Sequence, residues 1–115
     1  MDVDKTLIAI LETFKVPVYR QGSMSNEAVY PATFITIWNS DAPDHMHYDN
    51  KSFGTAWSFT VNVYSSDPDT PPTMIGQIRQ ALKDAGWAVN GKGYDVQSDE
   101  PTHTGRGIEC EYLQF

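Results

Sequence analysis

The stretch that decides the fold is residues 53–64, which reads Phe53-Gly54-Thr55-Ala56-Trp57-Ser58-Phe59-Thr60-Val61-Asn62-Val63-Tyr64. One set of alternate positions holds large apolar side chains, namely Phe53, Trp57, Phe59, Val61 and Val63. The positions between them hold Gly54, Ser58, Thr60 and Asn62. Because successive side chains of a β-strand point to opposite faces, this pattern predicts a strand with one buried and one open face, as is typical of antiparallel sheets.

The residues before this strand predict its hairpin partner. Residues 32–39 also alternate, with Phe34 and Trp38 on one face and Ile35 and Ile37 on the other. Because both faces are apolar, we expect this strand to be covered on both sides. The segment that follows, up to Asn50, is polar and contains a proline, so it predicts a long loop at the tip of a hairpin spanning residues 32–64.

Two segments have the apolar spacing of a helix. The first covers residues 2–14, where Leu7, Ile8, Ile10, Leu11 and Phe14 share one face, and a short strand over 16–19 follows it. The second covers residues 71–85, where the apolar face is formed by Met74, Ile75, Ile78, Ala81, Leu82 and Ala85. Thr70 or Asp69 suits its N-cap and Gly86 its C-cap. We predict that Trp57 and Phe59 pack under this second helix.

The C-terminal part predicts further strands. We expect a hairpin made of residues 87–89 and 94–97, with its turn at Asn90-Gly91-Lys92-Gly93. A polar loop over 98–105 and a last strand over 106–114 follow. The whole chain, residues 1–115, is therefore predicted to be a single α+β domain: a mostly antiparallel sheet with a long β-hairpin and two helices packed on it.

Composition limits the classes of function. The 115 residues are 40% hydrophobic and 20% charged, as in a globular domain. The net charge is −7, from 8 basic and 15 acidic residues, and no basic run exists, so we expect neither specific nucleic-acid binding nor membrane binding. A single cysteine, Cys110, excludes an internal disulfide. With an acidic N-terminus and no apolar signal segment, this composition predicts a protein of the reducing cytoplasm or of a particle assembled there.

The densest group of chemically active side chains is Asp44-His45-Met46-His47-Tyr48-Asp49. In an extended backbone His45 and His47 project to the same side, as a metal-binding pair would. Asp44 or Asp49 could add an oxygen ligand, and His103 a third imidazole. Alternatively this segment is a polar hairpin tip that contacts a neighbour, with histidines that make the contact sensitive to pH. Because no third ligand has motif spacing, we expect no metal and no cofactor.

The sequence offers no catalytic set. Glu109 and Glu111 lie on one strand face, as paired carboxylates would, but their alternation with Ile108, Cys110 and Tyr112 favours a solvated face. Cys110 itself falls on the apolar face without a Cys-His signature, which predicts a buried, inert thiol. The Gly91-Lys92-Gly93 run has no third glycine and no helix after it, so it is a turn rather than a dinucleotide loop. We expect the protein not to be an enzyme.

Three runs of the chain carry a resemblance to a known family. The run Pro31-Ala32-Thr33-Phe34-Ile35-Thr36-Ile37-Trp38 leads into the polar loop, and Ser58-Phe59-Thr60-Val61-Asn62-Val63-Tyr64-Ser65 leads directly into the second helix, which ends in Ala85-Gly86-Trp87. The run Gly107-Ile108-Glu109-Cys110-Glu111-Tyr112 closes the chain. In element order and size this sequence resembles the tail-terminator and head–tail joining (tail completion) proteins of long-tailed bacteriophages and prophages.

The resemblance implies a structural role in the virion tail or neck. Such proteins form a ring, typically a hexamer, that caps the tail tube and meets the head connector, so the expected partners are further copies of the chain, a tail-tube protein and a head connector protein. The interface candidates are Asp44, His45, Met46, His47, Tyr48 and Phe53, in or beside the polar loop. Glu109 and Glu111 are candidates for an acidic channel wall that repels DNA phosphates.

Two other functions stay open at this point. The chain could be a cytoplasmic small-ligand-binding or regulatory α+β module, with aromatic side chains lining a pocket. A small hydrolase is the weakest alternative, because no nucleophile and base stand in a recognisable pattern.

Overall fold

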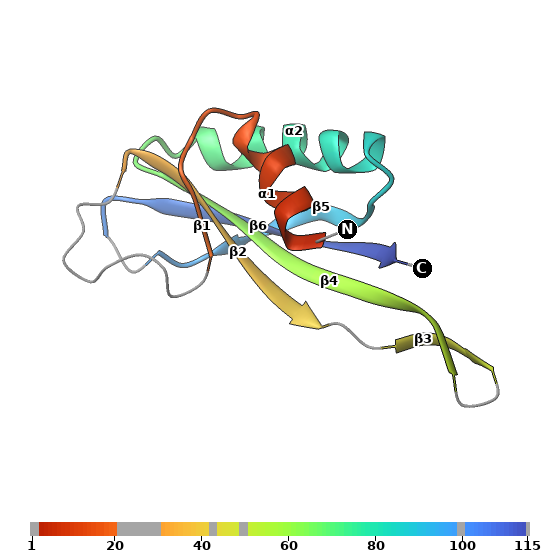
Figure 1. Cartoon of the computed structure of the whole chain (residues 1–115). Helices are drawn as coiled ribbons and strands as arrows, with labels where there is room; N and C mark the ends of the chain where they lie inside the picture. The colour runs from red at the N-terminus through yellow and green to blue at the C-terminus, as the bar shows by residue number, and fades with distance from the viewer. Residues whose placement is uncertain (1–2, 21–30, 42–43, 49–50, 99–100, 115) are drawn as a thin grey trace.

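The chain forms one sheet of six strands with two helices on one of its faces (Figure 1). The computed structural model describes residues 3–20, 31–41, 44–48, 51–98 and 101–114; at residues 40–41, 44–48 and 51–53 it describes the backbone alone. Within these residues a parallel pairing occurs between the first two strands, and every other pairing is antiparallel. The predicted α+β class with a mostly antiparallel sheet is confirmed.

The elements follow one another as α1 (Val3–Glu12), β1 (Val18–Arg20), β2 (Thr33–Asp41), β3 (Asp44–Tyr48), β4 (Lys51–Ser65), α2 (Thr70–Asp84), β5 (Ala88–Val96) and β6 (Thr104–Gln114). In the sheet the strand order is β1-β2-β4-β6-β5, and β3 pairs with the beginning of β4. The molecule measures 53 × 29 × 22 Å, and its long dimension follows from the length of β4.

Strand β4 is the centre of the sheet and of the core. It pairs with β2 from Ser58 to Ser65 and with β6 from Thr55 to Ser65. Its alternate residues Phe59, Val61 and Val63 are buried, as their spacing predicted. They belong to one apolar cluster whose other buried members come from both helices and the neighbouring strands: Val3, Leu7, Leu11, Ile35, Ile37, Ile75, Ile78, Leu82, Trp87, Ile108 and Cys110.

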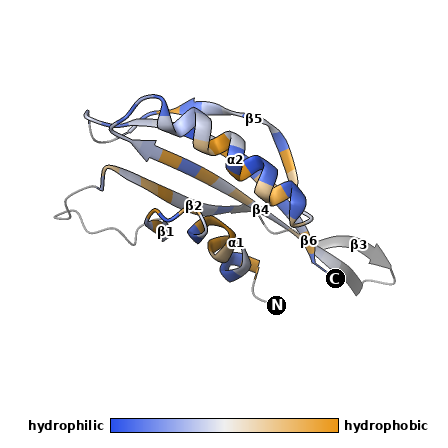
Figure 2. Cartoon of the chain, turned by 90° about the horizontal axis from the view of Figure 1, so that it is seen from above, coloured by the Kyte–Doolittle hydropathy of each residue, from blue (hydrophilic) through white to orange (hydrophobic). Residues whose placement is uncertain are grey.

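Both helices lie on the same side of the sheet and turn their apolar faces toward it (Figures 1 and 2). The buried residues of α2 are Pro71, Ile75, Ile78 and Leu82, which confirms the predicted apolar stripe. Asp69 occupies the N-cap position of α2, but its side chain makes no capping hydrogen bond. Helix α1 is tied to β1 by an ion pair of 2.7 Å between Asp4 and Arg20.

The predicted loop over residues 40–50 is wrong. Residues 44–48 form β3, which pairs with the first residues of β4, Asp44 with Thr55 and Tyr48 with Lys51. The polar composition suggested a loop, but the backbone of residues 44–48 is extended and pairs with β4, and Met46 and Tyr48 alternate with His45 and His47 along it. Strand β4 therefore begins earlier than predicted and extends beyond the sheet (Figure 1).

The expectation that β2 is covered on both faces is half right. Ile35 and Ile37 are buried under the helices, and Phe34 on the opposite face is only 3% exposed. Trp38, on the same face as Phe34, is 53% exposed. The second apolar face of β2 is therefore buried at Phe34 and exposed at Trp38.

The predicted hairpin over residues 87–97 is also wrong, because β5 is one strand that pairs with β6 along its length. Between the pairs Asn90–Glu109 and Tyr94–Gly107, β5 has three residues where β6 has one, so the glycine-rich segment is a bulge. Gly93 has φ +97°, a conformation that side chains disfavour. The same positive φ serves a hairpin turn or a bulge, and the sequence signal does not separate them.

The core position of Phe59 leads to a stability prediction. Phe59 is 1% exposed within the cluster that contains the α2 residues, whereas Trp57 is only partly buried against that cluster. We expect Phe59→Ala to lower the free energy of unfolding by about 3–5 kcal/mol. Trp57→Ala should cost less, because part of the ring already contacts solvent. Urea denaturation measures both, and equal losses would show that the two rings are buried alike.

Candidate functional site

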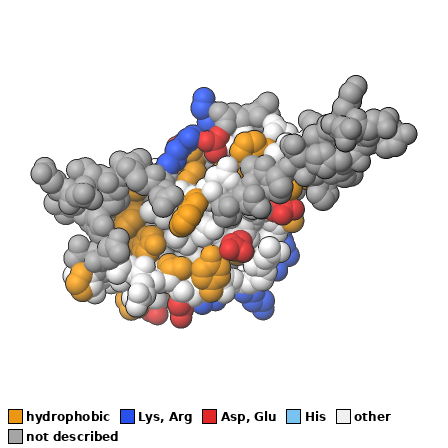
Figure 3. Space-filling model, turned by 90° about the horizontal axis from the view of Figure 1, so that it is seen from below, with side chains coloured by type: hydrophobic (Ala, Val, Ile, Leu, Met, Phe, Trp, Pro, Cys, Tyr) orange, Lys and Arg blue, Asp and Glu red, His pale blue; other side chains and the backbone are white. Residues whose placement is uncertain are grey.

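The sheet face opposite the helices, called the open face below, is the candidate functional surface. The strand registers place its residues in rows that cross the strands. From one end to the other, these rows are Phe34, Tyr64, Gly105 and Val96; Tyr19, Thr36, Asn62, Gly107 and Tyr94; Trp38, Thr60, Glu109 and Asn90; Ser58, Glu111 and Ala88; and Ala56 with Leu113. Figure 3 views the molecule from this side.

One end of the open face is closed by aromatic packing around Phe34. Its ring stacks on Tyr64, with centroids 5.2 Å apart, and meets the edge of Tyr19 at 6.1 Å. His103 lies 5.9 Å away and hydrogen-bonds through Nε2 to the Pro31 carbonyl oxygen at 2.8 Å. Because a carbonyl oxygen only accepts, Nε2 of His103 carries the proton. These contacts explain why Phe34 is buried although no described helix covers it.

Two glycines of β6 make room for the tyrosines on this face. A Cβ atom at Gly105 would come within 2.8 Å of the Tyr64 ring, and one at Gly107 would overlap Asn62 Oδ1 and lie 3.1 Å from the Tyr94 ring. Side chains from the neighbouring strands therefore lie over β6 at these two positions, which belong to the end of the open face where Phe34 packs.

The rest of the open face exposes large apolar side chains. Trp38 is 53% exposed, Tyr94 41% and Leu113 37%, and these are the exposed large hydrophobic side chains of the described residues. All three lie on the open face by register. Burial and, second, the charge of Glu109 raise the pKa of Tyr94, while a hydrogen bond with Thr60 lowers it. The three side chains are spread over the open face, Trp38 on β2, Tyr94 on β5 and Leu113 near the end of β6, with polar residues between them.

The charges on the open face have one sign. Glu109 and Glu111 are exposed there, and no described position in its rows is Lys or Arg. Arg20 and Arg106 fall on the other side of the sheet by register, and Figure 3 shows Lys and Arg only at the margins of this view. Apolar anchors among polar and acidic groups are the composition of a protein–protein contact rather than of a nucleic-acid site.

The predicted interface residues Asp44, His45, Met46, His47, Tyr48 and Phe53 lie in β3 and at the beginning of β4, and their side chains are outside the described residues. Their backbones form a two-stranded ribbon, defined here as residues 44–48 and 51–55. Strand β3 packs against β4 and makes no comparable contact with another described element. An isolated two-stranded ribbon is marginally stable in water, which makes this one a second candidate contact surface.

The structure separates His103 from the two histidines of the ribbon. His103 precedes β6 at the end of β4 where Ser65 lies, whereas His45 pairs with Gly54 near the other end. Eleven residues of extended strand span about 36 Å. His103 therefore cannot be a third ligand with His45 and His47. Among the described residues no three His, Cys, Asp or Glu are grouped so that they could hold a metal ion.

Zinc tests whether His45 and His47 form a metal site without His103. We expect zinc not to raise the melting temperature, because His103 is remote and the ladder places Asp44 on the opposite face from His45 and His47, which leaves fewer ligands than a stable site needs. Differential scanning fluorimetry with and without zinc measures this, since a metal that binds the folded state alone must stabilise it. A rise that His45→Ala with His47→Ala abolishes would establish a metal site.

Cys110 is a core residue rather than a nucleophile. It is 1% exposed, and burial raises its pKa from 9.0 to about 12. The Sγ–H donates to the carbonyl oxygen of Phe59 at 3.8 Å. The buried, inert thiol predicted for this position is in keeping with this environment.

The raised pKa of Cys110 predicts a loss of stability in alkali. Above pH 9 the unfolded chain releases the thiol proton while the folded chain keeps it, so stability falls by up to about 1.4 kcal/mol per pH unit until the folded pKa is reached. Cys110→Ala removes this contribution. Urea denaturation of both proteins from pH 8 to 11 measures the difference, and parallel pH profiles would contradict the raised pKa.

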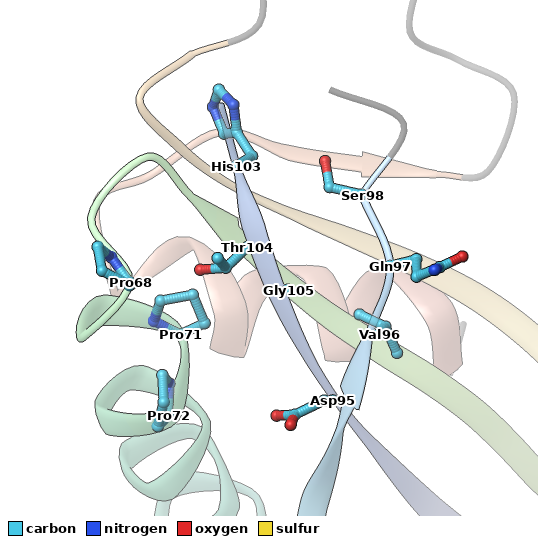
Figure 4. A pocket seen from close by; sticks show the side chains of 10 residues that line it. All are labelled: Pro68, Pro71, Pro72, Asp95, Val96, Gln97, Ser98, His103, Thr104 and Gly105. Carbon is cyan, nitrogen blue, oxygen red and sulfur yellow. The ribbon is translucent and has the colours of Figure 1, made fainter. Parts of the chain in front are cut away.

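A hollow of about 610 Å³ lies between the start of α2 and the ends of β5 and β6 (Figure 4). Its lining residues are Pro68, Pro71, Pro72, Asp95, Val96, Gln97, Ser98, His103, Thr104 and Gly105. Thr104 and Asp95 point toward the prolines, whereas Gln97 points away from them. The Asp95 carboxylate is already paired with Arg106 at 2.9 Å, and His103 is bonded as described above. The two ionisable side chains of the hollow are thus already engaged within the chain.

Sequence reasoning found part of these surfaces. It singled out the ribbon segment and the pair Glu109 and Glu111, but it missed the exposed aromatic surface of Trp38 and Tyr94. The available signal was the doubly apolar pattern of residues 34–38, which was interpreted as burial on both faces.

Neither helix of the described residues is long and apolar enough to cross a membrane. No protein-family model matches the chain, and no curated protein matches its sequence.

Proposed function

We propose that this protein is a structural subunit of a long-tailed bacteriophage or prophage, which assembles with copies of itself into a ring, caps the tail tube and joins the tail to the head. The proposal starts from the resemblance of three sequence runs and of the element order to tail-terminator and head–tail joining proteins. The described helices and strands keep that order, apart from the added β3 and the unbroken β5.

The observation that carries the proposal is the pair of unpartnered surfaces. One is the open face, with Trp38, Tyr94 and Leu113 exposed among carboxylates. The other is the two-stranded ribbon, in which β3 packs mainly against β4 and β6 reaches only Thr55. A monomeric protein gains nothing from exposing both, whereas a subunit that meets its neighbours and the tail tube buries them.

The charge of the open face argues against nucleic acid as the partner of that face. Glu109 and Glu111 stand together without a described Lys or Arg in their rows. A surface of this sign repels phosphates, so its partner is a protein rather than a nucleic acid. The proposed partners are therefore copies of the chain, a tail-tube protein and a head connector protein, and the proposed role is not enzymatic.

Shortening the ribbon tests the assembly role. Replacing residues 44–50 by a tight turn removes β3, and we expect the domain to keep its stability to within about 1 kcal/mol because a two-stranded extension contributes little on its own. Electron microscopy should then show heads without tails or tails of uncontrolled length. Normal-length tails joined to full heads would contradict the proposed role of the ribbon.

A control separates assembly from general damage. The variant with Gln80→Ala and Asp84→Ala removes an exposed hydrogen bond on α2, away from both surfaces. It should give normal particles. A monomer at every concentration, with a melting temperature that rises with a small ligand, would instead favour the ligand-binding alternative.

A further inference from the structure

We infer that Asn90 is a site of spontaneous modification, at which the backbone nitrogen of Gly91 attacks the side-chain amide and water converts that amide to a carboxylate. The reaction uses water as its co-reactant and needs no second protein. The inference rests on strand β5 and its surroundings, and it is independent of the proposed assembly role.

The chemistry follows from the glycine that comes after Asn90. The Gly91 nitrogen gives its proton to solvent hydroxide and forms a bond to Cγ of Asn90, while the Cγ–Nδ2 bond breaks, so that ammonia leaves and a cyclic imide remains. One water molecule then opens the ring at either carbonyl carbon and gives aspartate or isoaspartate. In total the chain exchanges ammonia for water, and nothing is oxidised or reduced. Because glycine has no side chain, the approach of its nitrogen to Cγ is unhindered.

The fold leaves this dipeptide open to solvent. Strand β5 is the last strand of the described sheet, and both Asn90 and Gly91 are exposed. The pair Asn90–Glu109 is the last one before the bulge, so Gly91 lies outside the regular ladder. Gly91 has φ +68°, and a Cβ atom added there would meet nothing within 4 Å. The Gly91 carbonyl oxygen accepts a hydrogen bond from Arg79 Nε at 2.9 Å, a contact that engages the oxygen and not the attacking nitrogen.

The other asparagines of the described residues lack this combination. Asn39 is exposed, but Ser40 follows it, and the serine side chain hinders the approach of the backbone nitrogen. Asn62 lies in β4 between two paired strands, its Oδ1 atom is buried, and the β-branched Val63 follows it. Exposure, a following glycine and a position beside a bulge therefore coincide at Asn90.

The product changes the charge of the open face. Asn90 stands directly opposite Glu109 in the ladder, in the row that also contains Trp38 and Thr60. A carboxylate at position 90 therefore faces a second carboxylate, and like charges at directly opposite positions destabilise a sheet. Isoaspartate in addition lengthens the main chain beside the bulge by one carbon atom. The modification thus makes the open face more acidic and weakens the pairing of β5 with β6.

Peptide mapping of the full chain tests the site. The folded protein is kept at mildly alkaline pH and digested with trypsin, and mass spectrometry follows the peptide of residues 84–92. We expect this peptide to gain the mass difference between a carboxylic acid and a primary amide, and to separate into two products of equal mass, several-fold faster than Asn39 changes. The matched variant Gly91→Ala should lose most of the change, because its Cβ hinders the attack on Asn90 without meeting another part of the chain.

Each outcome decides the inference. A folded protein that stays unchanged at Asn90 would overturn it, whether or not the urea-unfolded chain is modified there. Equal rates at Asn90 and Asn39 would overturn it as well, and this comparison holds in the unaltered chain even if Gly91→Ala does not fold. As a second measurement, Asn90→Asp should lower the urea midpoint, whereas Asn39→Asp, which lies opposite Phe59, should leave it nearly unchanged. Equal losses would contradict the repulsion between position 90 and Glu109.

Discussion

The pairing of β4 with its neighbours is the constraint on which the rest of the structure depends. Its buried residues Phe59, Val61 and Val63 form the centre of the apolar cluster, and both helices pack on the side to which they point. Its ladder with β6 covers Thr55 to Ser65, and its ladder with β2 begins only at Ser58. Because β4 is longer than either partner's ladder, its first residues extend beyond the sheet and pair with β3 alone.

The greater length of β4 than of its ladders with β2 and β6 bears on the proposed function. One side of the sheet is fully used by the helices, while the other keeps Trp38 and Tyr94 exposed, and the ribbon extends away from both. Among the described residues, no helix covers the open face, and the ribbon packs mainly within itself. We therefore favour a subunit of an assembly over a module with a ligand pocket. In the hollow beside the start of α2, Asp95 and His103 are already bonded to other groups of the chain.

The sequence predicted the fold class, the helices, the core strands and the burial of Cys110, because alternation and helical spacing report directly on the apolar core. The sequence-based prediction failed for segments whose side chains do not belong to the apolar core. Residues 44–48 form a strand although only Met46 and Tyr48 among them are apolar, and the glycines at 91 and 93 serve a bulge where a hairpin was expected. The open face was missed because Phe34 and Trp38 give the same signal, yet one is buried by Tyr64 and His103 and the other is not.

Hydrogen exchange along β4 tests the central claim most directly. The account predicts that the amides of residues 58–65 exchange slowly at every protein concentration, since they lie between two paired strands above the core. The amides of β3 and of residues 51–54 should exchange quickly in dilute protein and become protected when the protein is concentrated enough to assemble. Strong protection of these ribbon amides in the dilute monomer, or none in the assembled protein, would contradict the proposal that assembly covers the ribbon.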